Sequence, residues 1–153
     1  MRRASSASIA VAVLAVGLAG CGSADPAAVA AVGLDESGYL AVVQMCDQGR
    51  TVTHAGIVET DDGETALSWI GRTVEPITFF RVSEDPPDNW VVDTDGGMRT
   101  GGEYRFEATA SDDLVVSGPE FTLDDLNTLG IGEVIDADGV VSTLDDFLDS
   151  SCG

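Results

Sequence analysis

The chain has 153 residues, of which 27 are Asp or Glu and seven are Arg, so its formal net charge at pH 7 is −20. A surface this acidic excludes nucleic acid and anionic lipid headgroups as partners, because neither could find counter-charge on it. The chain contains no lysine that could act as a base or form a Schiff base.

The first 20 residues are typical of a secretory signal peptide. An Arg-Arg pair follows the first Met, and the uncharged apolar run 9–19 comes next. This run is shorter than the about 20 residues that a membrane-spanning helix needs. The small residues Ala19 and Gly20 leave the backbone accessible to a peptidase, so we expect cleavage just before Cys21. A short uncleaved membrane anchor is the alternative.

Leu18-Ala19-Gly20-Cys21 resembles the lipobox of bacterial lipoproteins. The resemblance implies removal of the signal peptide 1–20, diacylglycerol on the Cys21 sulfur, and an acyl chain such as palmitate on the new N-terminus. Each buried CH₂ contributes about 0.8 kcal/mol, so two or three chains hold a protein stably at a bilayer. As a class, the chain resembles small lipoproteins of high-GC Gram-positive bacteria. This implies localisation at the extracytoplasmic face of the cell membrane, with the lipid bilayer as one partner.

Cleavage changes the composition of the remaining protein. Without residues 1–20, five arginines face 27 carboxylates, a formal charge of −22. We expect a well-solvated, self-repelling surface; a cation-binding role and adaptation to high salt are the alternatives. Segment 21–38 is rich in small residues and interrupted by Pro26. It predicts the lipidated N-terminus and a flexible tether, followed by one domain over residues 39–153.

Three cysteines are present, Cys21, Cys46 and Cys152. If lipid modifies Cys21, the other two remain in an oxidising compartment, and we expect a disulfide between them. They lack CxxC spacing and an accompanying His cluster, which argues against a redox or zinc site. A disulfide closing a loop of roughly a hundred residues would stabilise the domain by about 4–5 kcal/mol in the chain-entropy model.

From residue 39 on, β-branched and apolar runs recur about every ten residues with turn residues between them. The runs 39–45 and 51–59 predict a hairpin with Cys46 at its end. Further strands are expected at 66–70, 77–82, 90–92, 103–109 and 114–116. Short strands at this spacing predict a mainly β fold, an antiparallel sandwich or barrel.

The clearest strand is 103–109, in which charged residues alternate with Tyr104 and Phe106. Gly102-Glu103-Tyr104-Arg105-Phe106-Glu107-Ala108 resembles the F strand of immunoglobulin-like domains, where a Tyr precedes a Cys by two residues; here Phe106 replaces that Cys. The resemblance implies an Ig-like β-sandwich. We expect Tyr104, Phe106 and both tryptophans in its core, and an exposed, ligand-stacking Trp90 is the alternative.

The C-terminal third predicts two short helices. Thr122 is expected to cap the first, with Asp125 at the capping-box position, and Thr143 to cap a final helix that runs toward Cys152. Each cap is followed by a pair of Asp residues. Neighbours in a helix point about 100° apart, and the helix dipole favours acidic first turns, so we interpret these pairs as capping residues rather than catalytic ones.

Residues 134–145 contain one candidate metal motif. With Gly139 at the sixth position, the segment resembles the calcium loops of EF-hands and dockerins. The residues at ligand positions would be Asp136, Asp138, Ser142 and Asp145. Val134 stands where the leading carboxylate belongs, so the resemblance implies weak calcium affinity at most.

The competing interpretation of this segment needs no ion. Strands at 131–135 and 139–142 with a turn over 136–139 would form a β-hairpin. We favour the hairpin because Gly130 and Gly132 interrupt the helix that should enter a calcium loop. No metal and no cofactor other than covalent lipid is therefore expected.

No catalytic motif is present in the sequence. His54 is the only histidine and lies in a strand-like run, where a structural or surface role is expected. We therefore predict no catalysis, and expect a membrane-anchored module that binds an envelope protein or ligand, or supports envelope assembly. The alternatives are a weak calcium-binding domain through 134–145 and an envelope hydrolase that uses His54 or a carboxylate pair.

Overall fold

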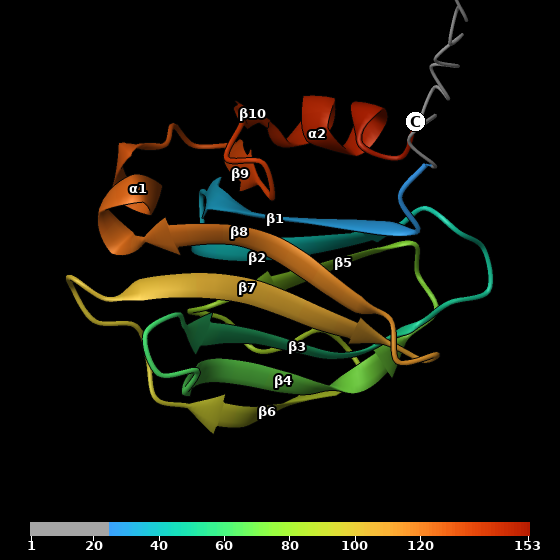
Figure 1. The fold of residues 1–153 in the computed structure, drawn as a ribbon, viewed down its shortest axis with the longest axis horizontal. Helices are drawn as coiled ribbons and strands as arrows, with labels where there is room; N and C mark the ends of the chain where they lie inside the picture. Colours follow the sequence, from blue (N-terminus) through green and yellow to red (C-terminus); the bar gives the residue numbers. More distant parts are fainter. Residues whose placement is uncertain (1–24) are drawn as a thin grey trace, which may run out of the picture.

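The computed structural model describes residues 25–153, which fold into two five-stranded antiparallel sheets packed face to face (Figure 1). In spatial order, the first sheet, sheet A, consists of β10 (Val141–Thr143), β9 (Glu133–Asp136), β1 (Ala28–Asp35), β2 (Gly38–Met45) and β5 (Ile77–Arg81). Sheet B consists of β6 (Trp90–Asp95), β4 (Thr65–Thr73), β3 (Val52–Glu59), β7 (Glu103–Ala110) and β8 (Val115–Thr122). Two short helices, α1 (Leu123–Thr128) and α2 (Leu144–Ser150), lie in the C-terminal third. The predicted antiparallel β-sandwich with short C-terminal helices is confirmed.

Aromatic side chains from both sheets form the centre of the core. Phe80 of β5 packs against Trp69 and Trp90 of sheet B, with ring centroids 5.2 and 4.8 Å apart. The two tryptophans are only 2% and 4% exposed. The prediction that both belong to the core is confirmed, and the alternative of an exposed, stacking Trp90 is wrong.

Strand β7 has the alternation that its sequence predicts. Tyr104 and Phe106 point into the core, and the residues that alternate with the buried ones along the strand are partly or fully exposed. The Tyr104 hydroxyl accepts the main-chain N–H of Arg99 at 2.7 Å and lies 3.3 Å from the carbonyl oxygen of the same residue. A hydrogen bond from this Tyr to the backbone a few residues upstream is a feature of the immunoglobulin-like F strand.

Strand β1 overturns part of the predicted tether. Residues 28–35 pair along their whole length with β2, and β9 pairs on the other side of β1. The flexible tether predicted over 21–38 is therefore wrong from residue 28 on, and the domain predicted over 39–153 begins with β1. Its alanines fit a strand buried between two neighbours. Gly33 is needed there because a Cβ would collide with the carbonyl of Glu133.

The predicted hairpin between 39–45 and 51–59 is also wrong. β2 pairs with β1 and β5 in sheet A, whereas β3 pairs with β4 and β7 in sheet B. Because both edges of β2 are occupied by other strands, residues 46–51 carry the chain from one sheet to the other. Turn residues between two strands predict a reversal of direction, and they do not distinguish pairing from crossing to the opposite sheet.

Both predicted helix caps are confirmed. The hydroxyl of Thr122 accepts the N–H of Asp125 at 3.1 Å, and the Asp125 carboxylate accepts the N–H of Thr122 at 2.8 Å, which completes the capping box. Thr143 caps α2 by accepting the N–H of Asp146 at 3.1 Å. Phe147 of α2 is buried in a second apolar cluster on the outer face of sheet A, where α2 covers the sheet (Figure 1).

Candidate functional site

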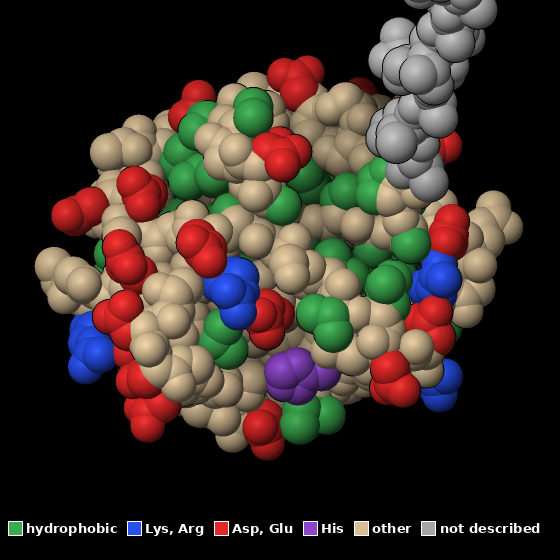
Figure 2. Space-filling model, in the orientation of Figure 1, with side chains coloured by type: hydrophobic (Ala, Val, Ile, Leu, Met, Phe, Trp, Pro, Cys, Tyr) green, Lys and Arg blue, Asp and Glu red, His purple; other side chains and the backbone are tan. Residues whose placement is uncertain are grey.

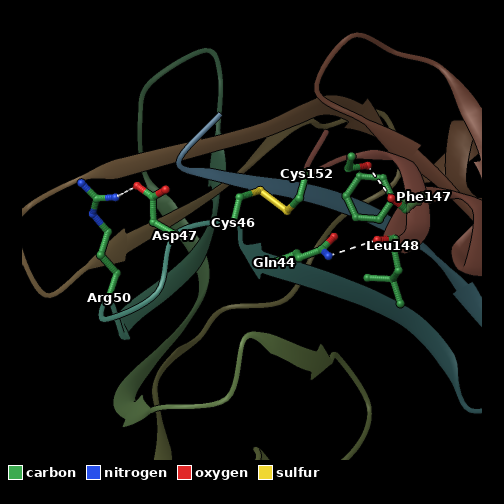
Figure 3. Close-up of a disulfide and its surroundings, with 8 residues drawn as sticks. Gln44, Cys46, Asp47, Arg50, Phe147, Leu148 and Cys152 are labelled. Atoms are coloured by element: carbon green, nitrogen blue, oxygen red, sulfur yellow. Dashed lines mark hydrogen bonds and ion pairs between the residues drawn. A yellow bond between two sulfur atoms is a disulfide. The ribbon is translucent and has the colours of Figure 1, made fainter. Parts of the chain in front are cut away.

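The predicted disulfide between Cys46 and Cys152 is present (Figure 3). Its two cysteines are 106 positions apart, and the bond joins the end of β2 to the turn that follows α2. Beside it, the side-chain amide of Gln44 donates a hydrogen bond of 3.1 Å to the carbonyl oxygen of Leu148 (Figure 3). α2 is therefore fastened to sheet A at two neighbouring points.

The start and the end of the described chain lie beside this disulfide. The main-chain N–H of Cys46 donates to the carbonyl of Ala27 at 2.9 Å, and a Cβ on Gly153 would lie 3.7 Å from the Asp25 carboxylate. We call this part of the sandwich the terminal end, defined by Asp25, Ala27, Cys46, Cys152 and Gly153. The predicted cleavage and lipidation residues, Gly20 and Cys21, lie outside the described residues 25–153.

The segment 134–145 forms the hairpin that we favoured. β9 and β10 pair antiparallel, and the turn between them closes as Gly139 takes a φ of +77°. The Asp136 carboxylate accepts the N–H groups of Asp138 and Val140 at 2.9 Å each. Asp136 therefore has a structural role in the turn that needs no ion.

Calcium binding by the four proposed ligand residues stays a prediction. Asp138 and Asp145 are exposed, and Ser142 is partly exposed on β10. Among residues 25–153, no three His, Cys, Asp or Glu side chains come close enough together to form a metal-binding group. Calorimetric titration with millimolar calcium remains the direct test of this alternative.

His54 lies on the outer face of sheet B, between Ile70 of β4 and Thr109 of β7 (purple in Figure 2). It is partly exposed on this flat face and does not line the groove described below. Asp and Glu side chains are spread around the same view, as the net charge leads one to expect (Figure 2). The alternative of a hydrolase based on His54 stays a prediction that the structure does not test.

A groove of about 850 Å³ runs along β5. The end of β4 and the turn after it, residues 72–75, form one wall, and residues 84–85 and 87–89 of the loop before β6 form the other. Asn89 has a φ of +67°, and the N–H of Trp90 donates to the carbonyl of Pro87 at 3.0 Å, which sets where this loop returns to the sheet. The volume lies within the about 300–1,000 Å³ that is usual for ligand sites.

Among residues 25–153, strand β5 is the edge of sheet A and pairs only with β2. The N–H of Val82 donates to the carbonyl of Tyr39 at 3.0 Å, and the N–H of Met45 donates to the carbonyl of Pro76 at 2.7 Å. In an antiparallel pair, residues bonded to the partner strand alternate with residues whose main-chain groups point away from it. The β5 residues with N–H and C=O groups directed to the open edge are therefore Ile77, Phe79 and Arg81.

The groove combines an apolar floor with an acidic rim. Phe79 and Ile77 are partly exposed there, and Val74 is 78% exposed. The charged residues that line it are Arg72, Arg81, Glu75, Glu84, Asp85 and Asp88. Arg81 is already engaged, because its guanidinium donates to Asp35 at 2.8 Å and lies 5.8 Å from the centre of the Phe79 ring. Carboxylates therefore outnumber cations around this groove.

Sequence reasoning did not find this groove. The sequence predicts a strand at 77–82 but assigns it no role in a site. The available signal was proline on both sides of the strand, Pro76 before it and Pro86-Pro87 after it. Proline at strand boundaries is typical of edge strands.

Comparison of the chain with protein-family models, with curated proteins and with solved structures finds no match in any of the three. Within residues 25–153, no helix is long and apolar enough to cross a membrane.

Proposed function

We propose that the protein is a lipid-anchored binding module on the extracytoplasmic face of the cell membrane, and that its ligand occupies the groove along β5. The observation that carries this proposal is the groove itself, about 850 Å³ beside an edge of sheet A whose outward main-chain groups have no partner strand within the described part of the chain, residues 25–153. The module acts by holding an envelope protein or ligand, without catalysis.

The geometry of the terminal end supports the anchored arrangement. Cys21 precedes Asp25 by four positions, which span at most about 14 Å of extended chain. Lipid on Cys21 would therefore hold the terminal end close to the bilayer. β5 begins beside Gln44, near this end, and finishes beside Leu40, so the groove would run outward from the membrane side.

Replacement of the lipidated residue tests the anchor. Cys21→Ala is expected to release the protein from the membrane fraction or to leave it unprocessed, because no sulfur remains to carry the diacylglycerol that holds it. Fractionation and mass spectrometry of the N-terminus measure this, with Ser23→Ala as the matched control. Normal processing and membrane retention of Cys21→Ala would contradict the proposal.

In-cell photo-crosslinking tests the groove. A photoreactive residue at Val74, on the groove wall, is expected to capture a distinct partner that mass spectrometry identifies. The matched control is Val115, which is 60% exposed on the outer face of sheet B. The same products from both positions, or none from Val74, would show that the groove is not the binding site.

A further inference from the structure

We propose that the ligand of the groove is an extended polypeptide segment that pairs antiparallel with β5, as a sixth strand of sheet A, and that carries alternating apolar and basic residues. This inference rests on the proposed function, since it assumes that the groove is the binding site. It adds the class of partner and the way in which the partner is held.

The first support is the set of main-chain groups at the open edge. Ile77, Phe79 and Arg81 direct their N–H and C=O groups away from β2. The groove is lined by these same three residues. An edge of this kind binds an extended chain through main-chain hydrogen bonds and selects it through pockets for alternate side chains.

The dimensions agree with such a segment. β5 has five residues, and five residues of extended chain span about 17 Å. The β4–β5 connection and the loop before β6 line the groove together with β5, and among residues 25–153 no strand pairs with the other edge of β5. A strand added there would lie in the groove instead of on an open surface.

The lining predicts the side chains of the partner. In an antiparallel pair, residues directly opposite each other point to the same face of the sheet. Ile77 and Phe79 lie with the second apolar cluster on the outer face, so residues opposite them are expected to be apolar. The residues that line the groove also include the carboxylates Glu75, Glu84, Asp85 and Asp88. Only Glu84 among these four lies near an arginine of the groove, 3.7 Å from Arg81, so the excess of negative charge favours Lys and Arg at the intervening positions of the partner.

Charge also argues against a second copy of this chain as the occupant. Pairing of β5 with β5 of another molecule would bring two acidic rims together, on chains that each carry a formal charge of −20 before processing. Like charges placed opposite each other across strands are destabilising. A basic segment of a different protein meets the same edge without this cost.

Backbone methylation of a probe peptide tests the pairing directly. The probe is the acetylated and amidated peptide Arg-Val-Arg-Val-Arg-Val-Arg, titrated against the full lipidated protein in a non-ionic detergent. In antiparallel pairing with valines on the outer face, the valine N–H groups bond to β5 and the internal arginine N–H groups point away. N-methylation at the valines should weaken binding by at least about tenfold, and N-methylation at the internal arginines by less than about threefold. Equal effects, no effect, the reverse order, or no binding of the parent peptide would overturn the proposal.

A matched pair of protein variants tests the same contact from the other side. Ile77→Pro removes an N–H that faces the groove and makes no bond to β2, so sheet A should tolerate it. Ile77→Val keeps the N–H and the β-branched shape. The expected result is a loss of peptide affinity of at least about tenfold for Ile77→Pro and less than about twofold for Ile77→Val, with cooperative unfolding retained in both. Equal affinities of the two variants would overturn the proposal.

Two further outcomes separate this inference from the proposed function. If Val74 crosslinks a partner in cells but the peptides show no methylation pattern, the groove is a binding site that does not work by strand addition. If sedimentation shows a dimer that Ile77→Pro dissociates, the edge pairs with a second copy, and the assignment to a basic partner is wrong.

Discussion

Tyr104 shows how one polar atom is accommodated in an otherwise apolar core. Its ring is fully buried against Phe121, and its hydroxyl is bonded to the main chain of Arg99. Without the hydroxyl, the main-chain N–H and C=O of Arg99 would both lose a partly buried hydrogen-bond partner. A buried unpaired donor costs more than the net gain of an ordinary hydrogen bond.

We therefore predict that Tyr104→Phe lowers the free energy of unfolding by about 1–2 kcal/mol, because it leaves the Arg99 N–H without its acceptor. Urea unfolding measures the change. Tyr39→Phe is the matched control, since its hydroxyl donates to Asn127 at 2.6 Å at an exposed position, where water can replace the lost bond. Equal losses in the two variants would contradict this account of Tyr104.

Arg50 and Asp112 give a prediction for acid stability. The Arg50 guanidinium donates to the Asp112 carboxylate at 2.7 Å and holds the pKa of Asp112 below its ordinary value of 3.8. A carboxylate whose pKa is lowered in the folded state stabilises the protein above the pKa of its unfolded form, and the contribution disappears as the pH falls through the folded pKa. Because the pair is exposed, salt screens it and the effect is small.

Asp112→Asn should therefore be slightly less stable than the unmodified chain at pH about 6, and the difference should vanish at pH about 2–3. Thermal unfolding at low ionic strength across this range measures it. Asp61 is exposed and forms no ion pair among residues 25–153, so Asp61→Asn provides the control. A stability difference for Asp112→Asn that persists unchanged at low pH would refute the role of the Arg50 pair.

The two short C-terminal helices, α1 and α2, depend on their N-terminal caps for stability. α1 has six residues and α2 has seven, which is too short for either to be stable alone. Each begins at a Thr whose hydroxyl satisfies a free N–H of the first turn, and each buries one residue, Leu126 or Phe147. Cap and burial together stabilise turns that would otherwise fray.

Thr122→Ala should lower the free energy of unfolding by about 1 kcal/mol, through loss of the hydrogen bond to the Asp125 N–H and of its reciprocal partner. Thr143→Ala should cost a similar amount at α2. Thr100→Ala, in the exposed turn before β7, is the control and should change little. If denaturant unfolding shows that Thr100→Ala loses as much unfolding free energy as the two cap variants, the capping contribution is disproved.

The disulfide joins two parts of the described chain that are not paired strands, the end of β2 and the turn after α2. Cys152 follows α2, which is part of neither sheet, and Cys46 directly follows β2 of sheet A. The bond closes a loop over 106 positions, so it restricts most of the unfolded chain. It also holds the C-terminus at the terminal end, beside Asp25.

The variant with both Cys46→Ser and Cys152→Ser should lose about 4–5 kcal/mol of unfolding free energy in the chain-entropy model. Guanidinium unfolding with and without reductant measures the loss, and the reduced natural chain should behave like the double variant. A loss below about 1 kcal/mol would mean that strain in the native state offsets most of the stabilisation that the disulfide gives by restricting the unfolded chain.

The features that depend on local chemistry follow from the amino-acid order alone. The alternation in 103–109 predicted β7, the Thr and Asp spacing predicted both caps, and the short strand-like runs predicted an antiparallel sandwich or barrel. The disulfide followed from counting cysteines once Cys21 was assigned to lipid. Each of these inferences uses interactions between residues close in sequence, or a count, and needs no knowledge of which strands become neighbours.

The pairing of the strands and the position of the groove depend on contacts between residues far apart in the sequence. The alanine-rich segment 28–35 looked like a tether because its burial comes from β2 and β9, and the close approach of β9 at Gly33 cannot be read from local sequence. β2 and β3 looked like a hairpin because turn residues do not specify a partner. The groove exists because β5 ends sheet A while β4 and the loop before β6 stand beside it. Such a site is made by long-range packing, which local patterns do not encode.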